Sequence, residues 1–242
     1  MRKLSGALMA ALVLIPAGAS AMSKNVSSPS VKDGVWSLKN RGSFESDGGR
    51  PDRSAWVNKV DLEYGINMHF KAAIGGEIQK IEGDSLDYAG TELKALYLMT
   101  GPDSSLQAGV QAAYKLDHTG GADELELELQ LAGDAYGLSH RANIALGHEV
   151  GSGSDGGLLA EMAWGSYYQV NDNLNVGGEY YADFGNLSDN DGFSEQQHHI
   201  GPVVGFRLPF TERRIDARLG YLVGFSKSSP DHVVKYELQT DF

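Results

Sequence analysis

The amino-acid sequence predicts an all-β fold, namely a single antiparallel transmembrane β-barrel of about twelve strands. Two observations lead to this prediction. From residue 35 onward, apolar and polar residues alternate through segments of about 10–16 residues, and clusters of turn-forming residues separate these segments. In addition, the N-terminus has the features of an export signal, which indicates a mature protein outside the cytoplasm.

Residues 1–21 are predicted to be a cleaved signal peptide. Arg2 and Lys3 precede the short apolar run LSGALMAALVLIPAGAS, and the small residues at 19–21 match a cleavage site near Ala21-Met22. An uncleaved anchor is the alternative, although the run is short for a spanning helix. Residues 22–34 (MSKNVSSPSVKDG) are polar and show no periodicity. We therefore expect a flexible N-terminal segment ahead of an outer-membrane β-barrel at 35–242.

The alternation predicts twelve strands. A helix would place apolar residues at i, i+3, i+4 and i+7, whereas these segments show period two. Because the first segment is insecure and the seventh and eighth alternate weakly, ten or fourteen strands are alternatives. The expected strands are 35–45, 54–65, 67–81, 86–100, 104–118, 122–133, 138–150, 157–170, 173–186, 196–209, 213–227 and 231–242.

The segment DELELELQL (123–131) shows why the apolar face is expected to meet lipid. Three glutamates fall on one face of this strand, and four leucines fall on the opposite face. A soluble sandwich or barrel would turn the leucines inward, whereas a membrane barrel turns them outward. The predicted segments exceed the roughly five to six residues of soluble strands and suit the about 9–11 residues of a membrane-spanning strand.

The connections alternate in length. The turns near 65–67 and 171–173 are short, whereas ESDGGRPDR (45–53), GSGSDGG (151–157) and NLSDNDGFSEQ (186–196) are longer. Outer-membrane barrels of Gram-negative bacteria have short periplasmic turns, longer extracellular loops and an even number of strands. The predicted location is therefore the outer membrane of a Gram-negative bacterium.

The C-terminus, YELQTDF, carries apolar residues at alternate positions, with Tyr236, Leu238 and the terminal Phe242 on one face. This pattern resembles the signal by which the outer-membrane insertion machinery recognises barrels. That machinery and outer-membrane lipids are therefore the expected partners, and a soluble edge strand that ends in Phe is the alternative. The sequence indicates no oligomeric state.

Composition excludes several classes of function. The formal net charge is −12 with 32 acidic and 20 basic residues, which argues against binding to nucleic acid. The chain has no cysteine and its seven histidines are scattered, so neither a metal site nor another cofactor is predicted. An outer-membrane enzyme is a third, weaker possibility. Ser139 and His140 are adjacent, but neighbours on a strand point to opposite faces and cannot pair, so no catalytic residues are assigned.

The predicted inner face carries charges of both signs, with acids in excess. Two functions follow from this pattern. A narrow water-filled lumen would pass small polar or cationic solutes, because carboxylates favour cations. Alternatively, paired charges would close the lumen and leave a structural or surface-interaction barrel that binds through loops 45–53 and 186–196. The candidate pore-lining residues are Asp61, Glu63, Glu92, Lys94, Glu124, Glu126, Glu128, Arg141, Glu161, Glu179, Arg214, Asp216 and Arg218.

Several stretches within residues 57–242 resemble exported outer-membrane barrel proteins of Gram-negative bacteria, which are porin- or transporter-like and mostly of unassigned function. The resemblance implies a transmembrane barrel and no established substrate or catalytic set. It rests on GGADELELEL (120–129), SHRANIALGHEVG (139–151), EYYADFGNL (179–187), QHHIGP (197–202) and GYLVGFSKSSPDHVVKYELQTDF (220–242).

Overall fold

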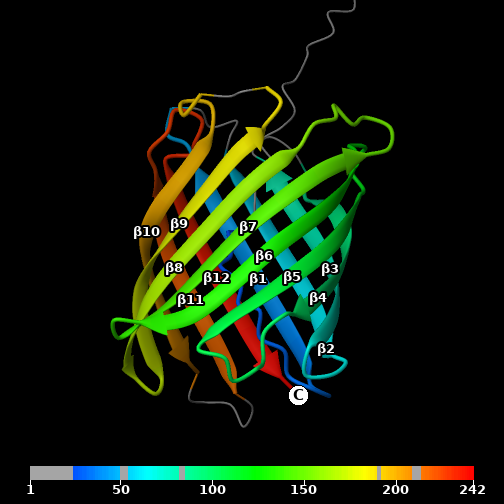
Figure 1. The fold of residues 1–242 in the computed structure, drawn as a ribbon. Helices are drawn as coiled ribbons and strands as arrows, with labels where there is room; N and C mark the ends of the chain where they lie inside the picture. Colours follow the sequence, from blue (N-terminus) through cyan, green and yellow to red (C-terminus); the bar gives the residue numbers. More distant parts are fainter. Residues whose placement is uncertain (1–23, 50–53, 82–84, 190–191, 209–213) are drawn as a thin grey trace, which may run out of the picture.

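The computed structural model describes residues 24–49, 54–81, 85–189, 192–208 and 214–242, and it forms a closed antiparallel barrel (Figure 1). The predicted signal peptide and its cleavage site lie outside the described residues. The twelve strands are β1 (Trp36–Ser46), β2 (Ala55–Gly65), β3 (Phe70–Ile81), β4 (Asp87–Leu98), β5 (Leu106–Asp117), β6 (Asp123–Ala135), β7 (Leu138–Val150), β8 (Leu159–Asn171), β9 (Leu174–Asn186), β10 (Gln197–Arg207), β11 (Ile215–Gly224) and β12 (His232–Asp241).

Each strand pairs with the next one along the chain, and β1 pairs with β12 to close the sheet. At this seam the register runs from Ser37 opposite Asp241 to Ser46 opposite His232. The predicted fold class is therefore confirmed, with twelve strands rather than ten or fourteen. The predicted strand ends lie within about three residues of the observed ones, because the period-two pattern stops where the turn residues begin.

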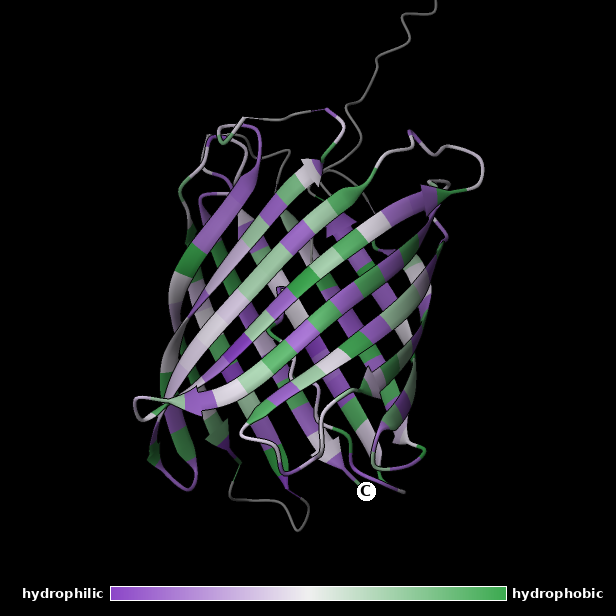
Figure 2. Cartoon of the chain, viewed as in Figure 1, coloured by the Kyte–Doolittle hydropathy of each residue, from purple (hydrophilic) through white to green (hydrophobic). Residues whose placement is uncertain are grey.

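The apolar face of the sheet is on the outside of the barrel. On β6, Leu125 and Leu127 are 49% and 53% exposed, whereas Glu126 between them faces the lumen. The same alternation runs along the other strands (Figure 2). Large outward aromatic side chains lie near both ends of the strands, among them Trp36 and Phe44 on β1. An apolar outer surface bordered by aromatic residues is suited to hydrocarbon between two polar interfaces.

The two ends of the barrel differ in their connections. The connections at one end run from the turns 136–137 and 172–173 up to 99–105 and 208–214, whereas the other end carries the longest connections, 47–54, 151–158 and 187–196. The first end also holds the hydrogen-bonded pair Trp36 and Phe242, and hence the C-terminus (Figure 1). We call it the periplasmic end and the other the extracellular end, following the loop lengths. No helix among the described residues is long and apolar enough to cross a membrane.

Residues 24–34 lie inside the barrel, which differs from the flexible segment expected for 22–34. Lys24 is buried and its ammonium is 3.9 Å from Glu45, near the extracellular end of β1. Lys32 forms an ion pair with Asp241 at the periplasmic end of β12. The segment therefore runs along the lumen from one end to the other. Its sequence gave no signal of this, because its partners come from strands far away in the chain.

Candidate functional site: the barrel lumen

A network of ion pairs covers the inner wall formed by β1 to β4. Asp61 on β2 lies between two cations, with one carboxylate oxygen 2.6 Å from Arg41 Nη1 and the other 2.7 Å from Lys94 Nζ. Lys94 is also 3.0 Å from Glu92, which is 2.6 Å from Lys59. The inward positions of adjacent strands bring these side chains together. Their charges are largely compensated within the wall.

Glu63 extends this network toward the periplasmic end. Its two carboxylate oxygens are each 3.0 Å from a lysine ammonium, one from Lys39 and one from Lys71. The predicted residues Asp61, Glu63, Glu92 and Lys94 thus all face the lumen, and each one is engaged in ion pairs. On this side of the barrel the structure resembles the closed, charge-paired alternative more than an open pore wall.

A second cluster surrounds Glu179 on β9. Its carboxylate is 2.6 Å from Lys235 Nζ and accepts hydrogen bonds from the hydroxyls of Tyr181, at 2.6 Å, and Tyr167, at 2.8 Å. Arg218 is 3.6 Å from the same carboxylate, and its guanidinium lies 4.7 Å from the centre of the Tyr167 ring. Such a buried carboxylate is stable only with partners of this kind. The predicted residues Glu179 and Arg218 are therefore members of one cluster.

The inner faces of β6 and β8 carry four glutamates and form an acidic surface. Glu124, Glu126 and Glu128 project from successive inward positions of β6, and Glu161 projects from β8. Lys115 is opposite Glu124 in the register, but its ammonium lies 3.9 Å from Glu77 on β3. Among the described residues, no lysine or arginine forms an ion pair with these four glutamates. We call this surface the acidic wall.

Two cavities lie in the periplasmic half of the lumen, with volumes of about 120 and 280 Å³. Arg141 lines both cavities, and its guanidinium lies 5.4 Å from the centre of the Tyr167 ring. Arg214 and Asp216, also predicted to line the pore, pair at 2.8 Å where β11 begins, and they border the larger cavity. Arg214 precedes the strand and is exposed, so it lies at the mouth rather than on the inner wall.

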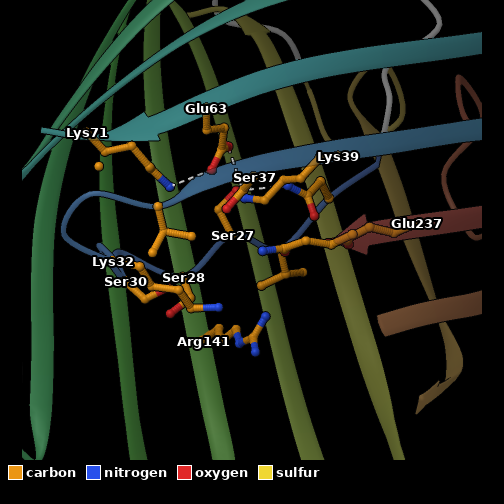
Figure 3. A pocket seen from close by; sticks show the side chains of 15 residues that line it. Ser27, Ser28, Ser30, Lys32, Ser37, Lys39, Glu63, Lys71, Arg141 and Glu237 are labelled. Atoms are coloured by element: carbon orange, nitrogen blue, oxygen red, sulfur yellow. Dashed lines mark hydrogen bonds and ion pairs between the residues drawn. The ribbon is translucent and has the colours of Figure 1, made fainter. Parts of the chain in front are cut away.

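Residues 24–34 line the smaller cavity together with side chains of the barrel wall. Figure 3 shows Ser27, Ser28 and Lys32 between the Glu63–Lys71 pair and Arg141. The Ser27 backbone nitrogen donates a 2.7 Å hydrogen bond to the side chain of Asn143 on β7. The segment thus occupies space that a solute would need. Pore-lining roles for the candidate residues stay a prediction.

Sequence reasoning missed part of this site. It did not place Lys39 and Arg41 in the lumen, because the first strand was the least secure of the twelve. It also overlooked the inward tyrosines Tyr167 and Tyr181, since period two assigns a face but not a partner across the barrel. The only local indication of their position was that Lys39 and Arg41 are both charged and lie two residues apart, as residues on one face of a strand do.

The structure also bears on the enzyme and metal alternatives. Ser139 and His140 do not pair; the Nδ1 atom of His140 lies 2.8 Å from the Ser166 hydroxyl of β8 instead. Among the described residues, no other polar group is hydrogen-bonded to this imidazole. Within the same residues, no three His, Asp or Glu side chains are grouped so that they could hold a metal ion.

Comparison with known proteins supports the fold. No family model matches the chain, and no curated protein matches its sequence. The structure of the KdgM porin in complex with disordered oligogalacturonate aligns with a TM-score of 0.54 at 10% identity, covering 85% of this chain and 98% of that one. The NanC porin aligns with a TM-score of 0.52 at 12% identity, with coverages of 85% and 98%. Likeness at such low identity establishes a shared barrel fold.

Proposed function

We propose that the protein is a narrow outer-membrane channel for small polar solutes and that it favours cations. The observation that carries this proposal is the acidic wall. Among the described residues, no lysine or arginine pairs with these glutamates, which face the lumen. The acids of β1 to β4, in contrast, are neutralised by lysine and arginine side chains. Uncompensated carboxylates along a narrow lumen attract cations and repel anions.

An outer-membrane location and passive transport fit the rest of the molecule. The outward leucines and rim aromatics suit a bilayer, and the porins with similar barrels provide a precedent for the architecture. Tyr236, Leu238 and Phe242 all lie on the outward face of the C-terminal strand or just after it. We propose that the insertion machinery reads these three side chains and that residues 1–21 direct export.

Ion selectivity tests this function. The variant with Glu124→Gln, Glu126→Gln and Glu128→Gln keeps the shape of β6 and removes three charges from the acidic wall. In planar bilayers with a salt gradient, we expect its reversal potential to move toward zero relative to the wild-type protein. Glu195→Gln, in the loop after β9, is the matched control and is expected to leave the reversal potential unchanged. An unchanged potential in the triple variant would remove the acidic wall from the conduction path.

A second candidate function is a non-conducting structural or surface-interaction barrel. The observation that favours it is the content of the lumen, which holds residues 24–34 and two clusters of ion pairs. In this case the extracellular loops would carry the binding function. Absence of conductance steps from the full-length mature protein and from a variant without its luminal segment would favour this candidate.

A further inference from the structure

We propose that residues 24–34 are a displaceable plug, so that the channel conducts only when this segment leaves the lumen. The inference rests on the proposed channel function. The starting point is the path of the segment, which runs from Glu45 at the extracellular end to Asp241 at the periplasmic end. A chain along that path passes through the lumen from end to end, and it borders one of the two periplasmic cavities.

The inner wall has a recess that matches one side chain of the segment. Val26 is 1% exposed and packs with Ala163, Tyr181, Leu222 and Val233, which come from β8, β9, β11 and β12. Inward apolar residues in a polar lumen would face water if the segment were absent. Four strands that are separate in sequence therefore contribute to a binding site for one valine of the same chain.

Glycines in the barrel wall leave room for the backbone of the segment where the two lie in close contact. A Cβ atom on Gly109 of β5 would lie 2.8 Å from the Pro29 Cβ, and a Cβ atom on Gly65 of β2 would overlap the Lys32 carbonyl oxygen. Any other residue at Gly65 would push the backbone of the segment away from the wall. The recess and the glycines are independent features, and both are adapted to the same segment.

The attachment of the segment is of a kind that can be reversed. Among the described residues, no backbone–backbone hydrogen bond joins residues 24–31 to a strand, so the segment is not part of the sheet. It is held by the Val26 contacts, by two hydrogen bonds to the Asn143 side chain and by a lysine ion pair near each end. The barrel closes by β1 to β12 pairing alone, so removal of the segment leaves every strand pair intact.

The charge of the segment also matches its position. Lys24 is the cation of the segment in the extracellular half, where Glu45 and the upper part of the acidic wall lie. When the segment leaves, Glu45 loses this ammonium, and Glu45 and the nearby glutamates of the acidic wall become accessible to mobile cations. The segment therefore occupies the same electrostatic site that the proposed channel offers to its solutes.

A disulfide lock tests this proposal in the full-length mature protein. The chain has no cysteine, so Pro29→Cys with Gly109→Cys introduces the only pair. A Cβ atom added at Gly109 would lie 2.8 Å from the Pro29 Cβ, which is shorter than the roughly 3.8 Å between the Cβ atoms of a disulfide, and a small shift of the segment restores that spacing. We expect oxidised protein to show no conductance steps in planar bilayers and reduction to restore them. Pro29→Cys alone is the matched control and should not respond to reductant.

Deletion of residues 25–31 separates failure of the plug from failure of the channel. We expect the deletion variant to conduct continuously, with larger steps than the wild-type protein. If the disulfide forms and oxidised and reduced proteins conduct equally, the plug is refuted and the channel survives. If the deletion variant also shows no conductance, the proposed channel function is refuted, and the proposed plug is refuted with it. If the cysteines at 29 and 109 do not crosslink in the folded barrel, the position of residues 24–34 inside the lumen is refuted.

Discussion

Lys235 and Glu179 form an ion pair whose side chains are only 1% and 0% exposed. Burial of the two charges is unfavourable, and it is tolerated because each one compensates the other and because two tyrosine hydroxyls add hydrogen bonds. The pair fixes the distance between β9 and β12 across the lumen, since these strands are not neighbours in the sheet. It therefore stabilises one shape of the barrel.

Removal of one partner is expected to cost more than removal of both. Lys235→Met leaves the carboxylate of Glu179 buried without its nearest cation, and such changes destabilise proteins by about 3–5 kcal/mol. Adding Glu179→Gln should recover most of this loss. Urea unfolding in lipid vesicles, followed by tryptophan fluorescence, measures both effects. Additive losses in the double variant would show that the two side chains are not coupled.

Individual pairs of this kind were beyond sequence analysis. The alternation assigned Glu179 and Arg218 to the lumen, as the structure has them. It could not assign partners, because a contact across the barrel depends on strand tilt and on the stagger of the closed sheet. The same limit explains why the predicted list combined paired residues such as Asp61 with unpaired ones such as Glu126.

The seam between β1 and β12 joins the two ends of the chain, so its formation closes the barrel. Gly42 on β1 leaves room for the ring of Tyr236, which passes over it from β12 and accepts a hydrogen bond from Asn58 on β2. A Cβ atom on Gly42 would lie 2.8 Å from that ring. An aromatic side chain that covers a glycine of the adjacent strand is a known device for fixing strand register.

Tyr236→Ala is therefore expected to loosen the seam. The folded barrel should convert to its slow-migrating unfolded form at a lower temperature in gel electrophoresis, because three strands lose a shared contact. Tyr168→Ala is the matched control, since Tyr168 is also an outward tyrosine but covers no glycine. Equal melting of the two variants would contradict a special role for Tyr236 at the seam.

Strands were the part of the fold that the sequence predicted best. Twelve segments with period two became twelve strands, because alternation is enforced along each strand by lipid on one side and a polar lumen on the other. Residues 24–34 were predicted least well. They follow no period, and their place depends on a recess made by Val233, Leu222 and residues of two other strands.

The molecule as a whole combines an apolar exterior with an ionic interior, which is the reverse of a soluble protein. This inversion explains the long strands, the closed sheet without edges and the exposed leucines together. It also leaves the lumen as the only polar passage through the barrel. The proposed transport, ion selectivity and plugging all depend on which way the side chains point.

Spin labels on β6 test this orientation most directly. Because the chain has no cysteine, single cysteines at 124, 125, 126, 127, 128 and 129 can each carry a nitroxide in vesicle-inserted protein. We expect labels at 125, 127 and 129 to be relaxed mainly by oxygen, which concentrates in lipid. Labels at 124, 126 and 128 should respond mainly to a water-soluble nickel complex. Loss of this alternation, or its inversion, would contradict the central claim that the leucines meet lipid and the glutamates meet the lumen.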